Sequence, residues 1–235
     1  MVKGEITLNI RKSSYIVGVL FLLAAVTAVI GVLLYGPLKY GSDYLIDGAE
    51  HGNQIVLGAL MELVLVVSAI GTATTMYPIL RKYNETIALW HVCFRFMEAV
   101  ILTIGVISML ALLSLSREFV ASGAIDTTTY HSAGVVLRSI HDWCLLLGAN
   151  FMLGINTIMY SYIFFKTKLV PRFISILGIT GSILVFSAAL LELFGVFSQF
   201  SVWGALFAIP VAANEMILAV WLLIKGFNEI SYKMK

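Results

Sequence analysis

The stretch YIVGVLFLLAAVTAVIGVLL, residues 15–34, carries no charged side chain and would be apolar on every side of a helix. A helix of about 20 apolar residues crosses the roughly 30 Å hydrocarbon core of a bilayer. Strands of a membrane barrel alternate apolar and polar residues over about 10 positions, and this stretch does not alternate. It therefore predicts a transmembrane helix.

Five further stretches have the same character. The predicted spans are residues 15–34, 55–76, 88–112, 143–165, 173–196 and 202–224. The predicted fold class is an all-α membrane protein, a bundle of six transmembrane helices, in which residues 1–235 form a single transmembrane helical domain. The apolar residues that follow Asp126 are spaced as on a helix face, so the fourth helix is expected to begin well before residue 143, outside the membrane.

The composition agrees with this environment. The chain has 235 residues, of which 60% are hydrophobic and 12% charged, whereas a soluble domain carries about 25% charged residues. A net charge of +2 and two cysteines also argue against a nucleic-acid-binding protein, a disordered chain and a secreted disulfide scaffold. The expected partners are membrane lipids, with a small-molecule ligand and another membrane subunit as further candidates, and no nucleic acid.

The positions of Lys and Arg predict the orientation, because positive residues in short loops resist translocation. With a cytoplasmic N-terminus, eleven of them lie on the inner side: Lys3, Arg11, Lys12, Arg81, Lys82, Lys166, Lys168, Arg172, Lys225, Lys233 and Lys235. Three lie outside: Lys39, Arg117 and Arg138. Both termini are therefore expected to be cytoplasmic, in a multi-pass protein of the cytoplasmic membrane.

Ionisable residues inside the spans are the most informative feature. An isolated ionised side chain at the centre of a membrane helix costs about 2.5 to 3.5 kcal/mol, so such groups should face the bundle interior and find partners. His91, Arg95 and Glu98 are spaced i, i+4 and i+7, which places them on one stripe of the third span. The candidate ligand or proton site comprises Glu62, Arg95, Glu98, Asn150, Asn214 and Glu215.

Depth follows from a rise of about 1.5 Å per residue. Glu62 and Asn150 should lie about 10 Å below the outer boundary, and Arg95 and Glu215 near the midplane. A polar track from the outer face to mid-membrane is possible if spans two, three, four and six are neighbours. Arg95 would supply a fixed positive charge that Glu98 orients. Glu62 and Glu215 would be the candidates for protonation, because burial penalises a charged carboxyl group.

A structural role competes with this hypothesis. A buried arginine with two or three carboxylates can be an ion-pair network that fixes helix register. His91 is expected at the inner membrane interface, and Glu192, at a span end, in contact with solvent. His141 and Asp142 are adjacent on a helix and therefore point about 100° apart, which argues against a catalytic dyad.

The chain has no motif typical of a catalytic, metal or phosphate site. No catalytic residue is assigned, and neither a cofactor nor a metal is expected. The favoured function is binding or conduction of a small ligand or proton at the buried Arg/Glu site. The alternatives are a membrane-embedded lipid-modifying enzyme, with carboxylates as general acids, and a non-catalytic partner subunit of a membrane complex.

Three segments carry a resemblance to a known family: FRFMEA at residues 94–99, LVPRFISILGITG at 169–181 and NEMILAVWLLIKG at 214–226. On these segments, and over nearly its whole length, the chain resembles a bacterial family of integral membrane proteins known as domain of unknown function 4386. The resemblance implies a multi-helix membrane fold in a bacterial membrane. It implies no activity.

Overall fold

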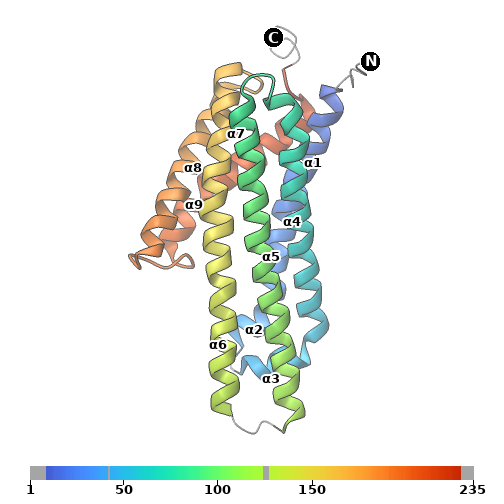
Figure 1. Ribbon diagram of the computed structural model, residues 1–235, viewed down its shortest axis with the longest axis vertical. Coiled ribbons are helices and arrows are strands. Elements are labelled where there is room, and N and C mark those ends of the chain that lie inside the picture. Colours follow the sequence, from blue (N-terminus) through green and yellow to red (C-terminus); the bar gives the residue numbers. More distant parts are fainter. Residues whose placement is uncertain (1–8, 42, 124–126, 229–235) are drawn as a thin grey trace.

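The computed structural model describes residues 9–41, 43–123 and 127–228, and Figure 1 shows its helices. Of the residues predicted to lie on the inner side, Lys3, Lys233 and Lys235 fall outside these ranges. The elements are α1 (Ile10–Leu34), α2 (Gly36–Tyr40), α3 (Tyr44–Glu50), α4 (Gly52–Leu80), α5 (Glu85–Ala121), α6 (Thr127–Cys144), the π-helix η1 (Leu145–Met152), α7 (Leu153–Thr167), α8 (Arg172–Leu193) and α9 (Val202–Ile224).

Within the described ranges, six helical segments are long and apolar enough to cross a membrane, which confirms the predicted fold class. The segments are α1, α4, α5, the continuous rod α6–η1–α7, α8 and α9. The rod begins at Thr127, so the fourth helix does start well before its apolar part. Several helices are longer than predicted, because a polar end does not stop a helix whose turns still pack.

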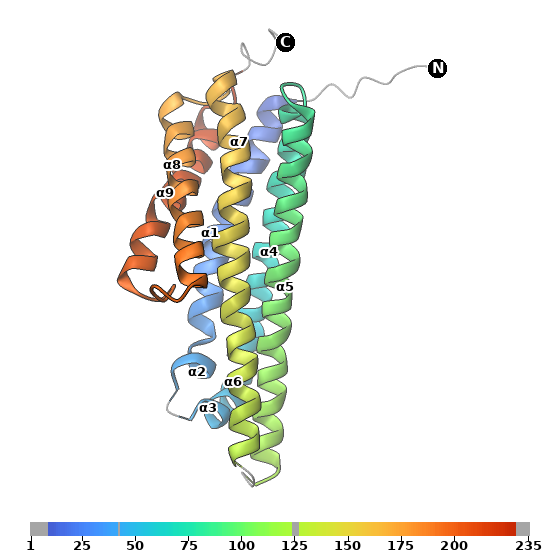
Figure 2. The same cartoon turned by 60° about the vertical axis from the view of Figure 1, so that its left-hand side comes forward.

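The six segments close into a ring. Neighbours along this ring are α1 with α4, α4 with α5, α5 with α7, α7 with α8, α8 with α9, and α9 with α1. The rod and α5 run the length of the molecule, whereas α8 and α9 flank only the half that contains the start of α1 (Figures 1 and 2). The interior of the ring is thus bounded by helices on every side.

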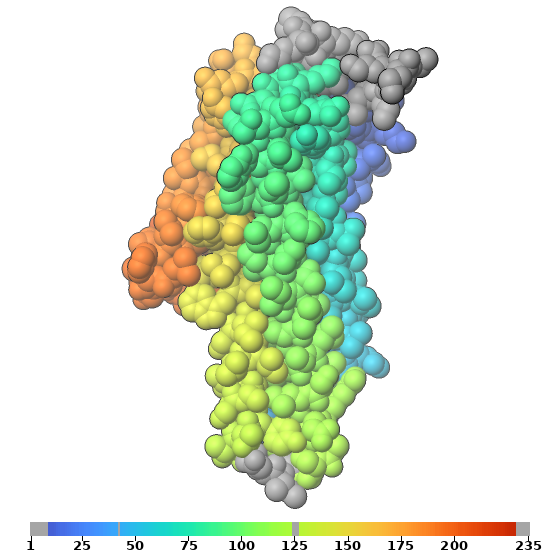
Figure 3. Space-filling model, in the orientation of Figure 1, coloured from blue at the N-terminus to red at the C-terminus, as the bar shows by residue number. Residues whose placement is uncertain are grey.

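The other end of the molecule narrows to a projection formed mainly by α5 and α6 (Figure 3). At about 1.5 Å per residue, the 37 residues of α5 measure about 55 Å, well beyond a hydrocarbon core of about 30 Å. The short helices α2 and α3 pack against the base of this projection, where Leu38, Leu45, Met109 and Phe119 form a buried apolar cluster with their neighbours. The projection therefore has a hydrophobic core of its own.

Small residues let the helices approach closely. A Cβ atom on Gly181 of α8 would lie 2.7 Å from the backbone nitrogen of Val211 in α9. A Cβ atom on Gly18 of α1 would lie 2.9 Å from the carbonyl oxygen of Ala219 in α9. Only glycine fits such contacts between backbones, which are typical of membrane helix packing.

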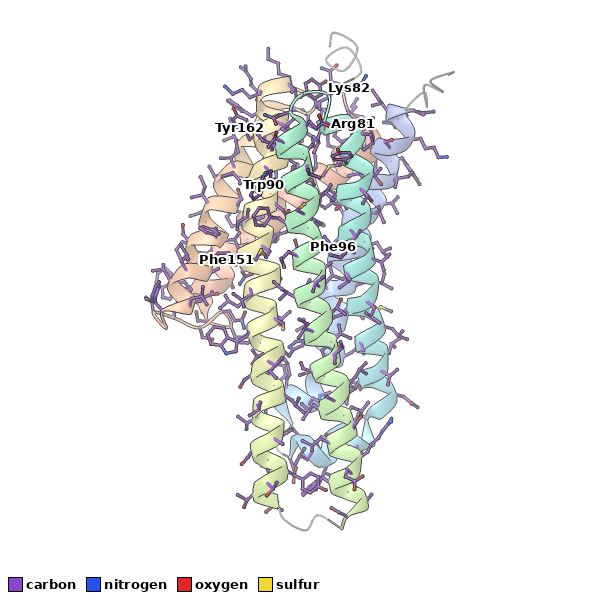
Figure 4. All side chains as sticks on the ribbon, in the orientation of Figure 1. Arg81, Lys82, Trp90, Phe96, Phe151 and Tyr162 are labelled. Carbon is purple, nitrogen blue, oxygen red and sulfur yellow. The ribbon has the colours of Figure 1, made fainter. Side chains whose placement is uncertain are left out.

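Basic side chains gather at the end of the bundle that contains the start of α1 and the end of α9. Figure 4 shows Arg81 and Lys82 at this end, whereas Phe96 and Phe151 lie farther along the bundle. Arg11, at the start of α1, donates two hydrogen bonds of 3.0 Å to the carbonyls of Leu223 and Ile224. The helices thus bring together the basic residues, within the described ranges, that the sequence assigns to one side.

Candidate functional site

The polar stripe of α5 faces the interior of the ring. His91, Arg95 and Glu98 are all buried, with exposed fractions of 0%, 4% and 3%. Their helical spacing turns them toward α7 and α9, while the opposite side of α5 presents apolar side chains such as Phe96 to the outside. The three residues therefore share one buried face of α5, as their spacing predicts.

Arg95 is the centre of a compact charged group. Its Nη1 donates hydrogen bonds of 2.9 and 3.1 Å to the two carboxylate oxygens of Glu98, one helical turn away. Its Nη2 lies 3.5 Å from Oε1 of Glu215 on α9. Asn156 on α7 donates a further hydrogen bond to Glu98. We call Arg95, Glu98, Asn156 and Glu215 the arginine cluster; it joins α5, α7 and α9.

One hydrogen-bond donor of the Arg95 guanidinium has no partner among the described residues. This donor is the buried Nε. The Phe21 ring lies 5.9 Å from the guanidinium carbon and offers a cation–π contact. Because an unmet buried donor costs about 1–3 kcal/mol, and more for a charged group, this N–H is a place where a further acceptor would stabilise the protein.

Beside the arginine cluster lies a partly open cavity of about 130 Å³. Arg95, Glu98 and Glu215 contribute its charged wall. The remaining wall is mostly apolar and includes five alanines, from α1, α4 and η1: Ala24, Ala25, Ala28, Ala69 and Ala149. The π-helical turn carries Ala149, and such turns occur frequently at functional sites. The cavity thus has one polar end and an apolar body.

Glu62 belongs to a second, separate group. Its Oε2 accepts a hydrogen bond of 3.0 Å from the hydroxyl of Tyr35. Its Oε1 lies 3.4 Å from Nε2 of His141. Its exposed fraction is 4%. We call Glu62, Tyr35 and His141 the Glu62 cluster; it joins the end of α1 to α4 and α6.

The two clusters lie at different depths. Arg95 lies about 15 Å from the start of α5, and Glu62 lies about 27 Å from the end of α4 at the same end of the bundle. In a hydrocarbon core of about 30 Å, the arginine cluster would be near the middle and Glu62 near the far boundary. The cavity includes Leu65, one turn from Glu62, but Glu62 itself does not line it.

The six candidate residues are therefore not one group. The structure brings together Arg95, Glu98 and Glu215, as the buried charges predicted. Asn150 instead lies with its amide nitrogen 3.5 Å from a carboxylate oxygen of Glu192. Asn214 donates a hydrogen bond of 2.7 Å to the carbonyl of Ile174 and so ties α9 to α8.

Two expectations about single residues were wrong. His91 has no surface exposed to a membrane interface: it is fully buried, with Nδ1 3.3 Å from the carbonyl oxygen of Asn156, because its stripe faces the bundle. Glu192 is not solvated: its exposed fraction is 7%, since the last turn of α8 packs against η1.

The expectation for His141 and Asp142 also needs correction. Nδ1 of His141 lies 3.7 Å from Oδ1 of Asp142, at ion-pair distance although the two residues are adjacent. Asp142 makes a shorter contact of 2.8 Å with Lys39 of α2. The Asp142 carboxylate thus links α6 to α2 through Lys39, which lies 103 positions away in the sequence.

Sequence reasoning missed two participants. Asn156 lies inside a predicted span, and as a buried polar residue it could have been included on the same grounds as Asn150. Tyr35 follows the first apolar run directly, and nothing in the local sequence indicates that it reaches Glu62. Its role depends on the turn between α1 and α2.

Comparison with known proteins identifies a family but no activity. No curated protein and no solved structure matches the chain. A family described as Domain of unknown function (DUF4386) matches residues 16–226, nearly the whole chain, and this match includes the residues of both clusters. The six membrane-length helices and this match together show that the chain belongs to the DUF4386 family of unknown function.

Proposed function

We propose that this protein binds a small amphipathic molecule in the cavity beside the arginine cluster. One observation carries the proposal: Arg95 lines an otherwise mostly apolar cavity and has a buried Nε–H without a partner among the described residues. A ligand with a hydrogen-bond acceptor at one end and a hydrocarbon body would satisfy both parts of the cavity.

The contacts of Arg95 and Glu215 indicate which chemical group the polar end of the ligand should carry. Both carboxylate oxygens of Glu98 accept hydrogen bonds from Arg95, whereas Glu215 is near Arg95 through one oxygen at 3.5 Å. Glu215 therefore has free acceptor capacity beside the free donor of Arg95. A hydroxyl or amide group, which both donates and accepts, complements this pair better than a carboxylate or an ammonium group does.

The volume limits the size of the ligand. A cavity of about 130 Å³ is close to the roughly 150 Å³ of an apolar cavity that holds benzene. The ligand, or the part of it that enters, should therefore be about the size of one aromatic ring.

The proposal includes the membrane in which the protein lies and its orientation there. The protein resides in the bacterial cytoplasmic membrane with both termini in the cytoplasm, since the described basic residues at the end with the start of α1 outnumber those at the other end. The arginine cluster then lies at mid-membrane, and the projection of α5 and α6 lies outside the cell.

The test uses 4-fluorobenzyl alcohol as a probe for the purified protein in nanodiscs. Fluorine NMR distinguishes probe bound to the protein from probe dissolved in lipid. We expect a saturable protein-bound resonance, which Ala28→Leu removes because the larger side chain fills the cavity. Ala212→Leu, on the exposed side of α9, is the matched control and should leave the resonance unchanged.

The polar end is tested with 4-fluorotoluene, which lacks the hydroxyl group. We expect 4-fluorotoluene to bind the wild type about tenfold more weakly than the alcohol. Equal binding of the two probes, or equal binding by the Ala28→Leu variant and the wild type, would show that Arg95 and Glu215 form a structural ion pair only.

A further inference from the structure

A surface pocket lies at the end of the bundle that is rich in basic residues, away from the arginine cluster. The pocket, of about 420 Å³, opens between the α7–α8 connection and the end of α9. Three cationic side chains line it: Lys168, Arg172 and Lys225. Within the described ranges, no acidic side chain forms an ion pair with any of the three.

The backbone adds to this positive character. Pro171 precedes α8, and the first turn of α8 begins at Arg172, so the positive end of the helix dipole points toward the pocket lining. Arg172 also lies over the Phe165 ring at 5.6 Å, which restrains its guanidinium near the pocket. The pocket thus combines three cations with a helix N-terminus, an arrangement that favours an anion.

An apolar groove adjoins this pocket. It has a volume of about 420 Å³ and is lined by Met216, Ile217, Val220, Trp221, Ile224 and Lys225 on the outward face of α9. Trp221 and Lys225 line both the groove and the basic pocket. The pocket and the groove therefore adjoin at these two residues, and the apolar part extends along the outward side of α9.

The frame of the basic pocket is fixed by contacts from three directions. The backbone N–H of Asn228 donates a hydrogen bond of 2.8 Å to the carbonyl of Leu169. The backbone N–H of Phe227 donates one of 3.0 Å to the hydroxyl of Ser14 on α1, and the Phe227 ring lies 5.5 Å from that of Phe164. The segment after α9 is thereby held across the end of α7, which gives the pocket a defined wall.

We propose that the pocket and groove together form a binding site for one anionic phospholipid. The phosphate-containing headgroup would contact Lys168, Arg172 and Lys225, and an acyl chain would lie in the groove along Ile217 and Val220. Trp221 stands between the two parts, where tryptophan is favoured because its ring is amphipathic. A basic pocket between helix ends is the typical site for such headgroups in membrane proteins.

The site is independent of the proposed ligand of the arginine cluster. Glu215 and Met216 are adjacent in α9, but Glu215 lines the cavity beside the arginine cluster and Met216 lines the outward groove. The bound lipid would tie α7, α8 and α9 together at the end of the bundle where their connections meet.

The experiment is native mass spectrometry of the full chain in detergent, titrated with phosphatidylglycerol and with phosphatidylcholine of the same acyl chains. We expect the wild type to bind phosphatidylglycerol about tenfold more tightly than phosphatidylcholine. The triple variant Lys168→Gln, Arg172→Gln, Lys225→Gln should lose this preference. Thermal unfolding of each variant shows whether the fold is intact, and all three side chains are exposed.

The matched control is Lys12→Gln, Arg81→Gln, Lys166→Gln, which removes the same charge from exposed residues that do not line the pocket. It should keep the preference for phosphatidylglycerol. An equal loss in the control would show a general surface charge effect, and an unchanged preference in the pocket variant would overturn the site. Displacement of the lipid by excess inorganic phosphate or glycerol phosphate would identify a free-phosphate site and also contradict the proposal.

Discussion

The hydroxyl of Tyr35 donates a hydrogen bond of 3.0 Å to Oε2 of Glu62, across the junction between the end of α1 and the middle of α4. Both side chains are buried, and the other oxygen of Glu62 lies 3.4 Å from His141. The carboxylate therefore has protein partners on both oxygens. Glu62 therefore links the end of α1, α4 and α6 through side-chain contacts and does not form part of the cavity beside Arg95.

Tyr35→Phe should lower the stability of the protein by about 1.5–3 kcal/mol, because it leaves a buried carboxylate oxygen without its donor. The midpoint of thermal unfolding in detergent measures this change. Tyr40→Phe is the control, since Tyr40 is 73% exposed at the same end of the molecule. Equal midpoints for the two variants would refute the role assigned to the Tyr35 hydroxyl.

Gly181→Ala should destabilise the bundle by about 1–3 kcal/mol, because its Cβ atom would lie 2.7 Å from the backbone of α9 and the two helices would have to separate. Gly36→Ala should have little effect, since no atom lies within 4 Å of the added Cβ. The two variants are compared by thermal unfolding. A tolerated Gly181→Ala would mean that α8 and α9 do not approach as closely as the structure shows.

Asn214→Leu should also destabilise the protein, by about 1–3 kcal/mol, because the carbonyl of Ile174 loses its donor and the Tyr160 hydroxyl loses an acceptor at 3.4 Å. Asn150→Leu is the comparison, because its amide makes a weaker contact of 3.5 Å with Glu192. The smaller effect is expected for Asn150→Leu in the same unfolding assay. The reverse order would argue against Asn214 as the link between α8 and α9.

The spans could be predicted from the sequence because each depends on a local run of apolar residues. Their ends could not, since residues such as Arg117 in α5 extend a helix that has already left the hydrocarbon core. The short helices α2 and α3 escaped prediction for a related reason. Helix α3 packs against α5, and α2 packs against α3 and contributes Leu38 to the same apolar cluster, so neither depends on a local sequence pattern.

The candidate site was predicted in part. The helical spacing of Arg95 and Glu98 is local, so their pairing followed from the sequence, and Glu215 joined them because a buried charge needs a partner. The separation of Glu62 from this cluster did not follow. It depends on the ring order of the helices and on Tyr35 and His141, which approach from distant parts of the chain.

The orientation can be tested by cysteine labelling in a Cys93→Ala, Cys144→Ala background. In intact bacterial cells, Ser132→Cys on the exposed surface of α6 should react with a membrane-impermeant maleimide, because the projection is proposed to lie outside. Arg81→Cys should react only after the cells are opened. The opposite pattern would reverse the proposed orientation.

Binding of a small amphipathic molecule at the arginine cluster can be observed by anomalous diffraction from crystals of the protein with 4-bromobenzyl alcohol. We expect a bromine peak inside the cavity among α1, α4 and α5, with the hydroxyl group of the probe beside Arg95 and Glu215. Bromine peaks confined to the lipid-facing surface, with the cavity free of probe, would contradict it.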